Sequence, residues 1–423
     1  MTQPGADHLP LTELLTPADL AGVADAVRRS CERATPLYPI GGGTRLSYGA
    51  VPVEPGVGLS LGRLDRLVDY PARDLTITVQ AGMTLAELAG RLAAEGQRLP
   101  VDVPRPDRAT VGGVLSTSVP GPRQYGCGTI RDYVIGLRAV DGSGTPFAGG
   151  GRVVKNAAGY DLCRLLTGSL GTLAVIVEVT LMVKPRPECS ALLACPLCDW
   201  EHAERLLAGL VHSSTLPAAI ELVAGPAWQD DPLLGPLPPS CVAGLVVGLE
   251  GTAAEVEWMI GRLQEELGQA GGKASTILQD AQADLLWGRL TEFPSAPAPG
   301  ALEPVVLRVH VLPDQTVQTV EDLLRLDPAG SVLAHAGNGM ILARLSLAPD
   351  RVAELLEGRL RPELSGRGGS AVVLSQPTGA GLGPVTVWGP RGPAHALMQS
   401  IKDQFDPRHV LNRGRFVFAS PTR

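Results

Sequence analysis

The 423-residue sequence lacks the features that would mark a membrane, secreted or nucleic-acid-binding protein. No run of 18 apolar residues occurs, so we expect no transmembrane helix. Residues 1–10 have neither the basic start nor the apolar core of a signal peptide. Lys and Arg total 36 against 43 Asp and Glu, a formal charge of −7, which does not favour a nucleic-acid partner. We therefore expect a cytoplasmic protein.

Cysteine is scarce and scattered. The seven cysteines are odd in number and spread along the chain, which indicates reduced thiols and argues against a disulfide framework. Only Cys195 and Cys198 form a CxxC pair, whereas zinc and iron–sulfur sites need about four ligands. We interpret the pair as two small buried residues. Electrons that reach this chain would then leave it through a partner.

Two nucleotide-binding motifs are also missing. No GxxxxGK[ST] occurs, so ATP chemistry is not favoured. Residues 37–40 are typical of a strand that runs into Gly41-Gly42-Gly43-Thr44, but residues 46–61 have no helical period. The strand, glycine turn and helix of a Rossmann unit are therefore not predicted.

The pattern of elements changes along the chain. We predict a helix that starts at Thr16-Pro17, a capping-box helix at 84–96 and a helix at 160–167. Strands are predicted at 74–80, 134–140 and 173–183. The chain exceeds the size at which one core stops growing, and Lys184-Pro185-Arg186-Pro187 breaks the pattern. We place a domain boundary near residue 189.

Two glycine-rich stretches can hold a diphosphate. Gly41-Gly42-Gly43-Thr44 can supply converging backbone N–H donors, and Gly112-Gly113 with the hydroxyls at 116–118 is a second candidate. Each stretch alone is equally typical of a plain turn. Together, at this separation and followed by a third glycine stretch, they are more specific.

These stretches resemble a known family. Residues of about 30 to 187 are similar to the FAD-binding domain of the vanillyl-alcohol oxidase / p-cresol methylhydroxylase (PCMH) superfamily. The matching segments are Pro39–Thr44, Thr110–Gly113, Gly150–Leu162 with its KNxxGYDL pattern, Gly168–Leu173, and Phe405–Pro407 with Leu411–Gly414. The KNxxGYDL and GSLGTL patterns look most like the glycolate oxidase and D-lactate dehydrogenase branch, nearest to the small FAD-binding subunit of bacterial glycolate oxidase.

The resemblance implies an α+β fold in three parts. A PCMH-type FAD-binding domain of two α/β subdomains would span residues 1–189. An α+β cap domain with an antiparallel sheet, facing substrate or partner, would span 190–395. A C-terminal segment, 396–423, would return to the FAD domain.

The resemblance also implies which residues bind FAD. The first loop would wrap the pyrophosphate, the second would line the opposite side, and the third would meet the nucleotide half. The implied residues are Pro39, Ile40, Gly41, Gly42, Gly43, Thr44, Arg45, Thr110, Val111, Gly112, Gly113, Ser116, Gly121, Gly168, Gly171, Val175, Ile176, Val177 and Asn412.

The cap segment departs from the family pattern. Catalytic relatives carry HxGDGNLH, whose histidines hold a metal, and the counterpart here is His335-Ala336-Gly337-Asn338-Gly339-Met340-Ile341-Leu342. The first His is kept, but Asn338, Met340 and Leu342 replace Asp, Asn and the second His. We expect no metal here, and we interpret His335 as a structural histidine.

Oxidation of a 2-hydroxy acid needs a cation for the carboxylate and a base for the hydroxyl proton. Arg308 and His310 alternate with apolar residues, so both side chains are predicted on one face of a strand. They are our catalytic candidates, although a solvated outer strand face would show the same pattern.

Two functional hypotheses remain open. In the first, the chain is an FAD-dependent 2-hydroxy-acid oxidase or dehydrogenase subunit that passes electrons to a partner. In the second, it is a non-catalytic subunit supporting a paralogous, larger flavoprotein. Both predict a complex with that flavoprotein and an iron–sulfur subunit. A reductase of cell-wall precursors on the same flavin fold is a more distant alternative.

Overall fold

The computed structural model describes residues 9–151, 159–229, 231–234, 241–271, 276–296, 303–377 and 380–417. The chain divides into two compact units. Unit 1 comprises residues 1–119, 129–186 and 381–423, and unit 2 comprises residues 120–128 and 187–380. Two stretches differ from the sequence-based boundaries, because 120–128 belongs to unit 2 and 381–395 belongs to unit 1. Part of the KNxxGYDL segment, residues 152–158, lies outside the described residues.

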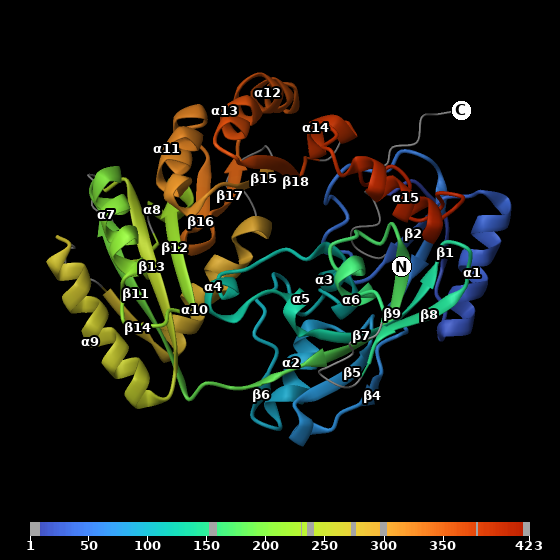
Figure 1. Ribbon diagram of the computed structural model, residues 1–423, viewed down its shortest axis with the longest axis horizontal. Helices are drawn as coiled ribbons and strands as arrows, with labels where there is room; N and C mark the ends of the chain where they lie inside the picture. Colours follow the sequence, from blue (N-terminus) through green and yellow to red (C-terminus); the bar gives the residue numbers. More distant parts are fainter. Residues whose placement is uncertain are drawn as a thin grey trace. The chain divides into compact units, whose positions relative to one another are not determined.

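Unit 1 contains two main sheets (Figure 1). The first is parallel, with strand order β1-β3-β2, and the second is antiparallel, with order β4-β5-β9-β7-β8. The strands are β1 Leu11–Leu15, β2 Leu37–Ile40, β3 Gly56–Ser60, β4 Leu67–Asp69, β5 Thr76–Gln80, β7 Val134–Asp141, β8 Pro146–Gly150 and β9 Ala174–Met182, with a small pair β6 Gln97–Arg98 and β10 Lys184–Pro185.

Several helices of unit 1 begin at a residue whose side chain caps the first turn. The helices of this unit are α1 Leu20–Arg33, α2 Leu85–Ala93, α3 Val111–Thr117, α5 Ile130–Tyr133, α6 Leu162–Leu166, α14 Pro384–Trp388 and α15 His395–Phe405. Thr84 caps α2 by accepting from the Glu87 N–H, as the capping box predicts. The predicted start of the first helix was wrong, because Asp19 and not Thr16 provides the cap, accepting from Gly22 N–H at 2.8 Å.

The second glycine stretch forms a helix. Thr110 is the N-cap of α3, its hydroxyl accepting from the Gly113 N–H. The helix packs beside β9, a strand that is buried along almost its whole length, as the β-branched run predicts. The core of this region gathers residues from β5, β7, β9, α2 and α3. The second glycine stretch is therefore held in place by the packing of α3 against this core.

Unit 2 is built on one eight-stranded antiparallel sheet, in the order β14-β11-β13-β12-β16-β17-β15-β18. The strands are β11 Cys189–Leu197, β12 Ala219–Ala224, β13 Ala243–Gly251, β14 Thr276–Gln279, β15 Val305–His310, β16 Ser331–His335, β17 Met340–Leu345 and β18 Ser370–Ser375. The helices are α4 Gln124–Cys127, α7 Trp200–Val211, α8 Pro226–Gln229, α9 Ala253–Gln269, α10 Asp280–Glu292, α11 Thr316–Leu326, α12 Pro349–Leu355 and α13 Arg361–Gly366.

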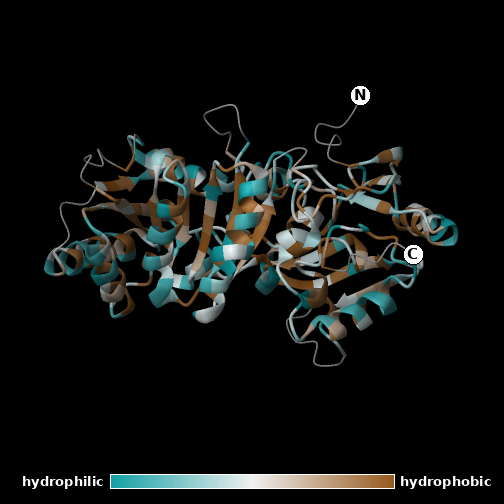
Figure 2. Ribbon diagram, turned by 90° about the horizontal axis from the view of Figure 1, so that it is seen from above, coloured by the Kyte–Doolittle hydropathy of each residue, from teal (hydrophilic) through white to brown (hydrophobic). Residues whose placement is uncertain are grey.

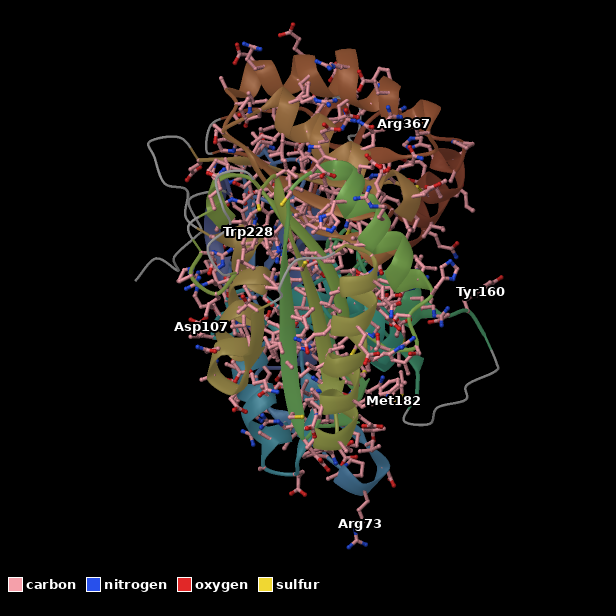
Figure 3. The ribbon with its side chains drawn as sticks, turned by 90° about the vertical axis from the view of Figure 1, so that its left-hand side faces the viewer. Arg73, Asp107, Tyr160, Met182, Trp228 and Arg367 are labelled. Carbon is pink, nitrogen blue, oxygen red and sulfur yellow. The ribbon has the colours of Figure 1, made fainter. Side chains whose placement is uncertain are left out.

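Apolar residues concentrate on the strands, and the helices present polar residues on their outer sides (Figure 2). Trp228 is buried in unit 2, where it stacks on Phe293 with ring centroids 5.1 Å apart, whereas the exposed Arg73 and Arg367 project from the ribbon (Figure 3). All seven cysteines are free. None of the described helices is long and apolar enough to cross a bilayer.

Candidate cofactor site

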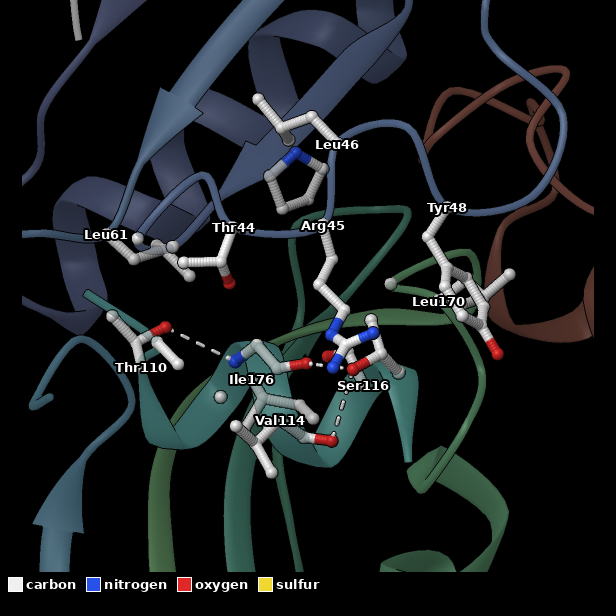
Figure 4. A pocket seen from close by; sticks show the side chains of 18 of the residues that line it. Thr44, Arg45, Leu46, Tyr48, Leu61, Thr110, Val114, Ser116, Leu170 and Ile176 are labelled. Atoms are coloured by element: carbon white, nitrogen blue, oxygen red, sulfur yellow. Dashed lines mark hydrogen bonds between the residues drawn. The ribbon is translucent and has the colours of Figure 1, made fainter. Parts of the chain in front are cut away.

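A cavity in unit 1 brings together loops that lie far apart in the sequence (Figure 4). About 870 Å³ of space between these loops is free of protein atoms, with the open solvent at the mouth included. The predicted residues that line it are Pro39, Gly41, Gly42, Gly43, Thr44, Arg45, Thr110, Gly112, Gly113, Ser116, Gly171, Val175, Ile176 and Asn412. The three glycine regions of the sequence therefore meet at one cavity.

The first loop offers donors to the cavity. Within the described residues, the backbone N–H groups of Gly41, Gly42, Gly43 and Thr44 donate to no protein acceptor. Two carbonyls of the same loop are occupied, because Arg108 donates to Gly42 O at 3.3 Å and Arg105 donates to Thr44 O. A loop whose N–H groups are free suits an anion such as a diphosphate.

Close packing explains the glycine at position 42. A Cβ built there would lie 1.6 Å from the Arg108 carbonyl oxygen, a backbone atom. A side chain is therefore excluded unless the loop moves away from residues 108–110. Glycine allows the two loops to approach each other across the floor of the cavity.

Two further arginines bear on the charge of the cavity. Arg45 extends across it toward Ser116 on α3 (Figure 4). Arg415 is buried in the wall and donates to Leu46 O at 2.9 Å and Tyr48 O at 2.8 Å. Burial lowers the pKa of Arg415 to about 10, so it remains a cation at neutral pH. The cavity thus carries positive charge beside its N–H donors.

Five of the predicted cofactor residues do not line this cavity: Ile40, Val111, Gly121, Gly168 and Val177. Four of them lie in unit 1, and Gly121 lies in the stretch 120–128 of unit 2. That segment is fixed by Arg123, whose Nε is 2.7 Å from Glu250 Oε1 and whose guanidinium lies 3.9 Å above the Trp287 ring.

The sequence reasoning missed several lining residues, among them Tyr48, Leu170 and Arg415. Tyr48 and Arg415 belong to loops without periodicity, and Trp388 connects them by packing near Tyr48 and donating to Arg415 O at 3.1 Å. Leu170 lies inside the GSLGTL pattern, which could have indicated it. Nothing in the sequence pattern could have placed Arg415, 370 positions after Arg45, at the same cavity.

The catalytic candidates lie in unit 2, on β15. Arg308 and His310 share one face of this strand, as predicted. Partial burial of the ring and the nearby Arg308 cation lower the pKa of His310. In the sheet register His310 pairs with Met340, Met340 with His335, and His335 with Glu221. This face of the sheet therefore carries His310, His335 and Glu221 in one row.

The His335 side chain is paired with the carboxylate of Glu221. Its Nδ1 lies 2.8 Å from a carboxylate oxygen of Glu221, and both side chains are almost completely buried. Nε2 of His335 has no partner among the described residues. Within those residues no group of three or more His, Cys, Asp or Glu side chains could hold a metal ion. The histidine is therefore oriented through one nitrogen by a protein carboxylate.

Comparison with known proteins identifies the class that the fold and cavity define. A family model described as an FAD binding domain matches residues 12–148. Alkyldihydroxyacetonephosphate synthase has the same fold, with a TM-score of 0.67 at 18% identity over 94% of this chain and 75% of that protein. The chain is therefore a flavoprotein with a PCMH-type FAD-binding domain, and its cofactor is FAD.

The relatives narrow this class. D-2-hydroxyglutarate dehydrogenase of Xanthomonas citri pv. viticola is 30% identical over 94% of this chain and 88% of the relative. Glycolate oxidase subunit GlcD of Bacillus subtilis is 27% identical over 93% and 86%. Glycolate oxidase subunit GlcE of Escherichia coli is 32% identical over 48% of this chain and 66% of the relative. The chain belongs to this family of FAD-dependent oxidoreductases.

Proposed function

We propose that this chain is the FAD-binding subunit of a glycolate oxidase or dehydrogenase type of complex that oxidises a short 2-hydroxy acid to the 2-oxo acid. The observation that carries the proposal is the cavity in unit 1, where unpaired N–H donors of the first glycine loop and two arginines surround a space suited to a dinucleotide. FAD would supply the two-electron acceptor for the oxidation.

Each wall of the cavity has a separate task in this proposal. The N–H groups of Gly41–Thr44, with Arg45, would hold the diphosphate. Thr110, Gly112, Gly113 and Ser116 would line the opposite side. The wall formed by Gly171, Val175, Ile176 and Asn412 would meet the nucleotide half.

The substrate groups are assigned to unit 2. Arg308 would hold the substrate carboxylate, and His310 would accept the hydroxyl proton. A lowered pKa keeps the His310 imidazole neutral near pH 7, which a proton acceptor requires. The three relatives described above are named for glycolate or D-2-hydroxyglutarate, and this favours a short 2-hydroxy acid.

The same residues leave a second candidate function. Where relatives of the family carry HxGDGNLH, this chain has Asn338, Met340 and Leu342, so it can also be a non-catalytic subunit that keeps FAD and supports a larger paralogous flavoprotein. The similarity to both GlcD and GlcE supports an assembly of related subunits. An iron–sulfur subunit as electron acceptor and a cytoplasmic location complete this proposal.

The test is a visible absorption spectrum of the purified chain, followed by anaerobic addition of glycolate and of D-lactate. Bleaching of the flavin band by either acid would establish substrate chemistry in this chain. A band that stays unbleached here but is bleached in the complex co-expressed with its partner subunits would assign the chemistry to another chain. Purification without any flavin band would contradict the assignment of the cavity.

A further inference from the structure

The C-terminal segment, residues 402–415, contacts three parts of the cavity wall. Arg415 holds the loop that follows the first glycine stretch, through Leu46 O and Tyr48 O. Leu37, the first residue of β2, donates to Val410 O at 2.8 Å and accepts from Asn412 N–H at 2.9 Å. Because β2 leads directly into Gly41, both ends of the first loop are fixed by the C-terminal segment.

The same segment holds the opposite wall. Lys402 Nζ donates to Thr172 O at 2.7 Å, and Asn412 Nδ2 donates to Leu170 O at 2.7 Å. Leu170 has φ 55°, in the left-handed region, which costs a non-glycine residue conformational energy. This conformation therefore depends on contacts from outside the loop, and the C-terminal segment supplies two of them.

A buried ion pair organises these contacts. Lys402 Nζ lies 2.5 Å from Asp406 Oδ2, with side-chain exposures of 4% and 0%. Asp406 also accepts from the Val410 N–H at 3.0 Å and the Leu411 N–H at 2.8 Å. A buried charge is tolerated only when it is paired and hydrogen-bonded, so loss of either partner would disturb the whole turn from 406 to 412.

We propose that residues 402–415 form a latch whose Lys402–Asp406 pair positions the nucleotide wall of the cavity, so that latch docking and FAD binding stabilise each other. The inference rests on the assignment of FAD to this cavity. Neither Lys402 nor Asp406 lines the cavity; they act through Thr172, Leu170 and Asn412. They are positioning residues for the cofactor.

The first experiment needs no variant. Hydrogen exchange of the full chain is followed with and without FAD, at the Val410 and Leu411 amides and, as a reference, at amides of β13 in unit 2. Coupling predicts that FAD slows exchange at Val410 and Leu411 by roughly tenfold or more and leaves β13 unchanged. Equal exchange at Val410 and Leu411 in both states would overturn the proposal.

The second experiment removes the pair. Lys402→Met with Asp406→Asn leaves no unpaired buried charge and keeps an acceptor for the turn, but it loses the donor to Thr172 O. We expect the FAD dissociation constant, measured by flavin fluorescence, to rise roughly tenfold. Arg205→Met is the matched control, because it removes another i, i+4 ion pair, with Glu201, on the surface of unit 2. A constant within twofold of the wild type would overturn the latch.

The Gly42→Ala variant distinguishes failure of the cavity assignment from failure of the latch proposal. If this variant still holds FAD with unchanged affinity, the cavity assignment fails, and the latch fails with it. If it loses FAD while the charge-removed double variant binds normally, the cavity assignment stands and the latch alone is wrong.

Discussion

The cavity of unit 1 is formed mainly by backbone groups, whereas the candidate substrate site on the sheet of unit 2 is formed by side chains. Backbone N–H groups, glycines and two arginines make the cavity. The strand face is the face of the unit 2 sheet that carries the side chains of Arg308, His310, His335 and Glu221. A backbone site needs glycine at a few fixed positions, whereas a side-chain site can be altered one residue at a time without loss of the sheet. Cofactor binding and substrate chemistry can therefore be lost independently.

We expect the largest effect from a substitution that disrupts the cavity of unit 1, lowers FAD affinity and leaves the strand face of unit 2 unchanged. In Gly42→Ala the new Cβ would meet the Arg108 carbonyl oxygen, so the loop must move and its N–H donors lose their direction. We expect FAD affinity to fall roughly 100-fold, measured by the flavin content of the purified chain and by titration with FAD. Gly90→Ala is the control, because its Cβ would meet nothing within 4 Å. Equal FAD content in the two variants would contradict the cavity assignment.

The next effect concerns unit 2 alone. Glu221→Ala leaves the buried His335 without its hydrogen-bond partner, and we expect the free energy of unfolding to fall by about 2.5 kcal/mol. Tryptophan fluorescence during denaturant unfolding suits this test, because Trp200, Trp228, Trp258 and Trp287 lie in unit 2 and only Trp388 lies in unit 1.

Glu221→Gln keeps the shape and an acceptor for the imidazole, so its loss should be smaller, and FAD binding should be unchanged in both variants. If Glu221→Ala unfolds like the wild type but abolishes turnover of the assembled complex, the pair serves the reaction and the structural interpretation of His335 is wrong.

A smaller effect decides between the two functional hypotheses. If Arg308 holds the substrate carboxylate, Arg308→Ala removes a charge-assisted hydrogen bond worth about 2 kcal/mol, and kcat/KM for glycolate falls roughly 30-fold. If the chain is non-catalytic, the assembled complex keeps its rate. Arg359→Ala, which removes an exposed ion pair with Glu363, is the control and should leave the rate unchanged under both hypotheses.

The sequence predicted the local elements of unit 1 better than the contacts between its distant segments, for a physical reason. Strands such as β2 and β9 are local, and so is the cap of α2, so their residues specify them directly. The α3 helix was missed because Gly112 and Gly113 are poor helix formers, and the Thr110 cap and the packing against β9 outweigh that preference. Arg415 and the Lys402–Thr172 contact join segments more than 200 residues apart, and no local pattern records such contacts.

The smallest expected effect tests the state of His310. Its pKa is lowered by partial burial and by Arg308, so the unfolded chain binds a proton more readily than the folded one. The resulting stability is complete above the ordinary pKa of about 6.5 and is lost as the pH falls through the window down to the lowered value. His310→Asn removes this dependence. We expect the unfolding free energy of the wild type, relative to that of the variant, to be higher at pH 7.5 than at pH 5, by a small amount because the side chain stays partly exposed. A difference that stays constant between these pH values would show that His310 titrates as in the unfolded chain, which would remove the argument for a neutral proton acceptor on this strand.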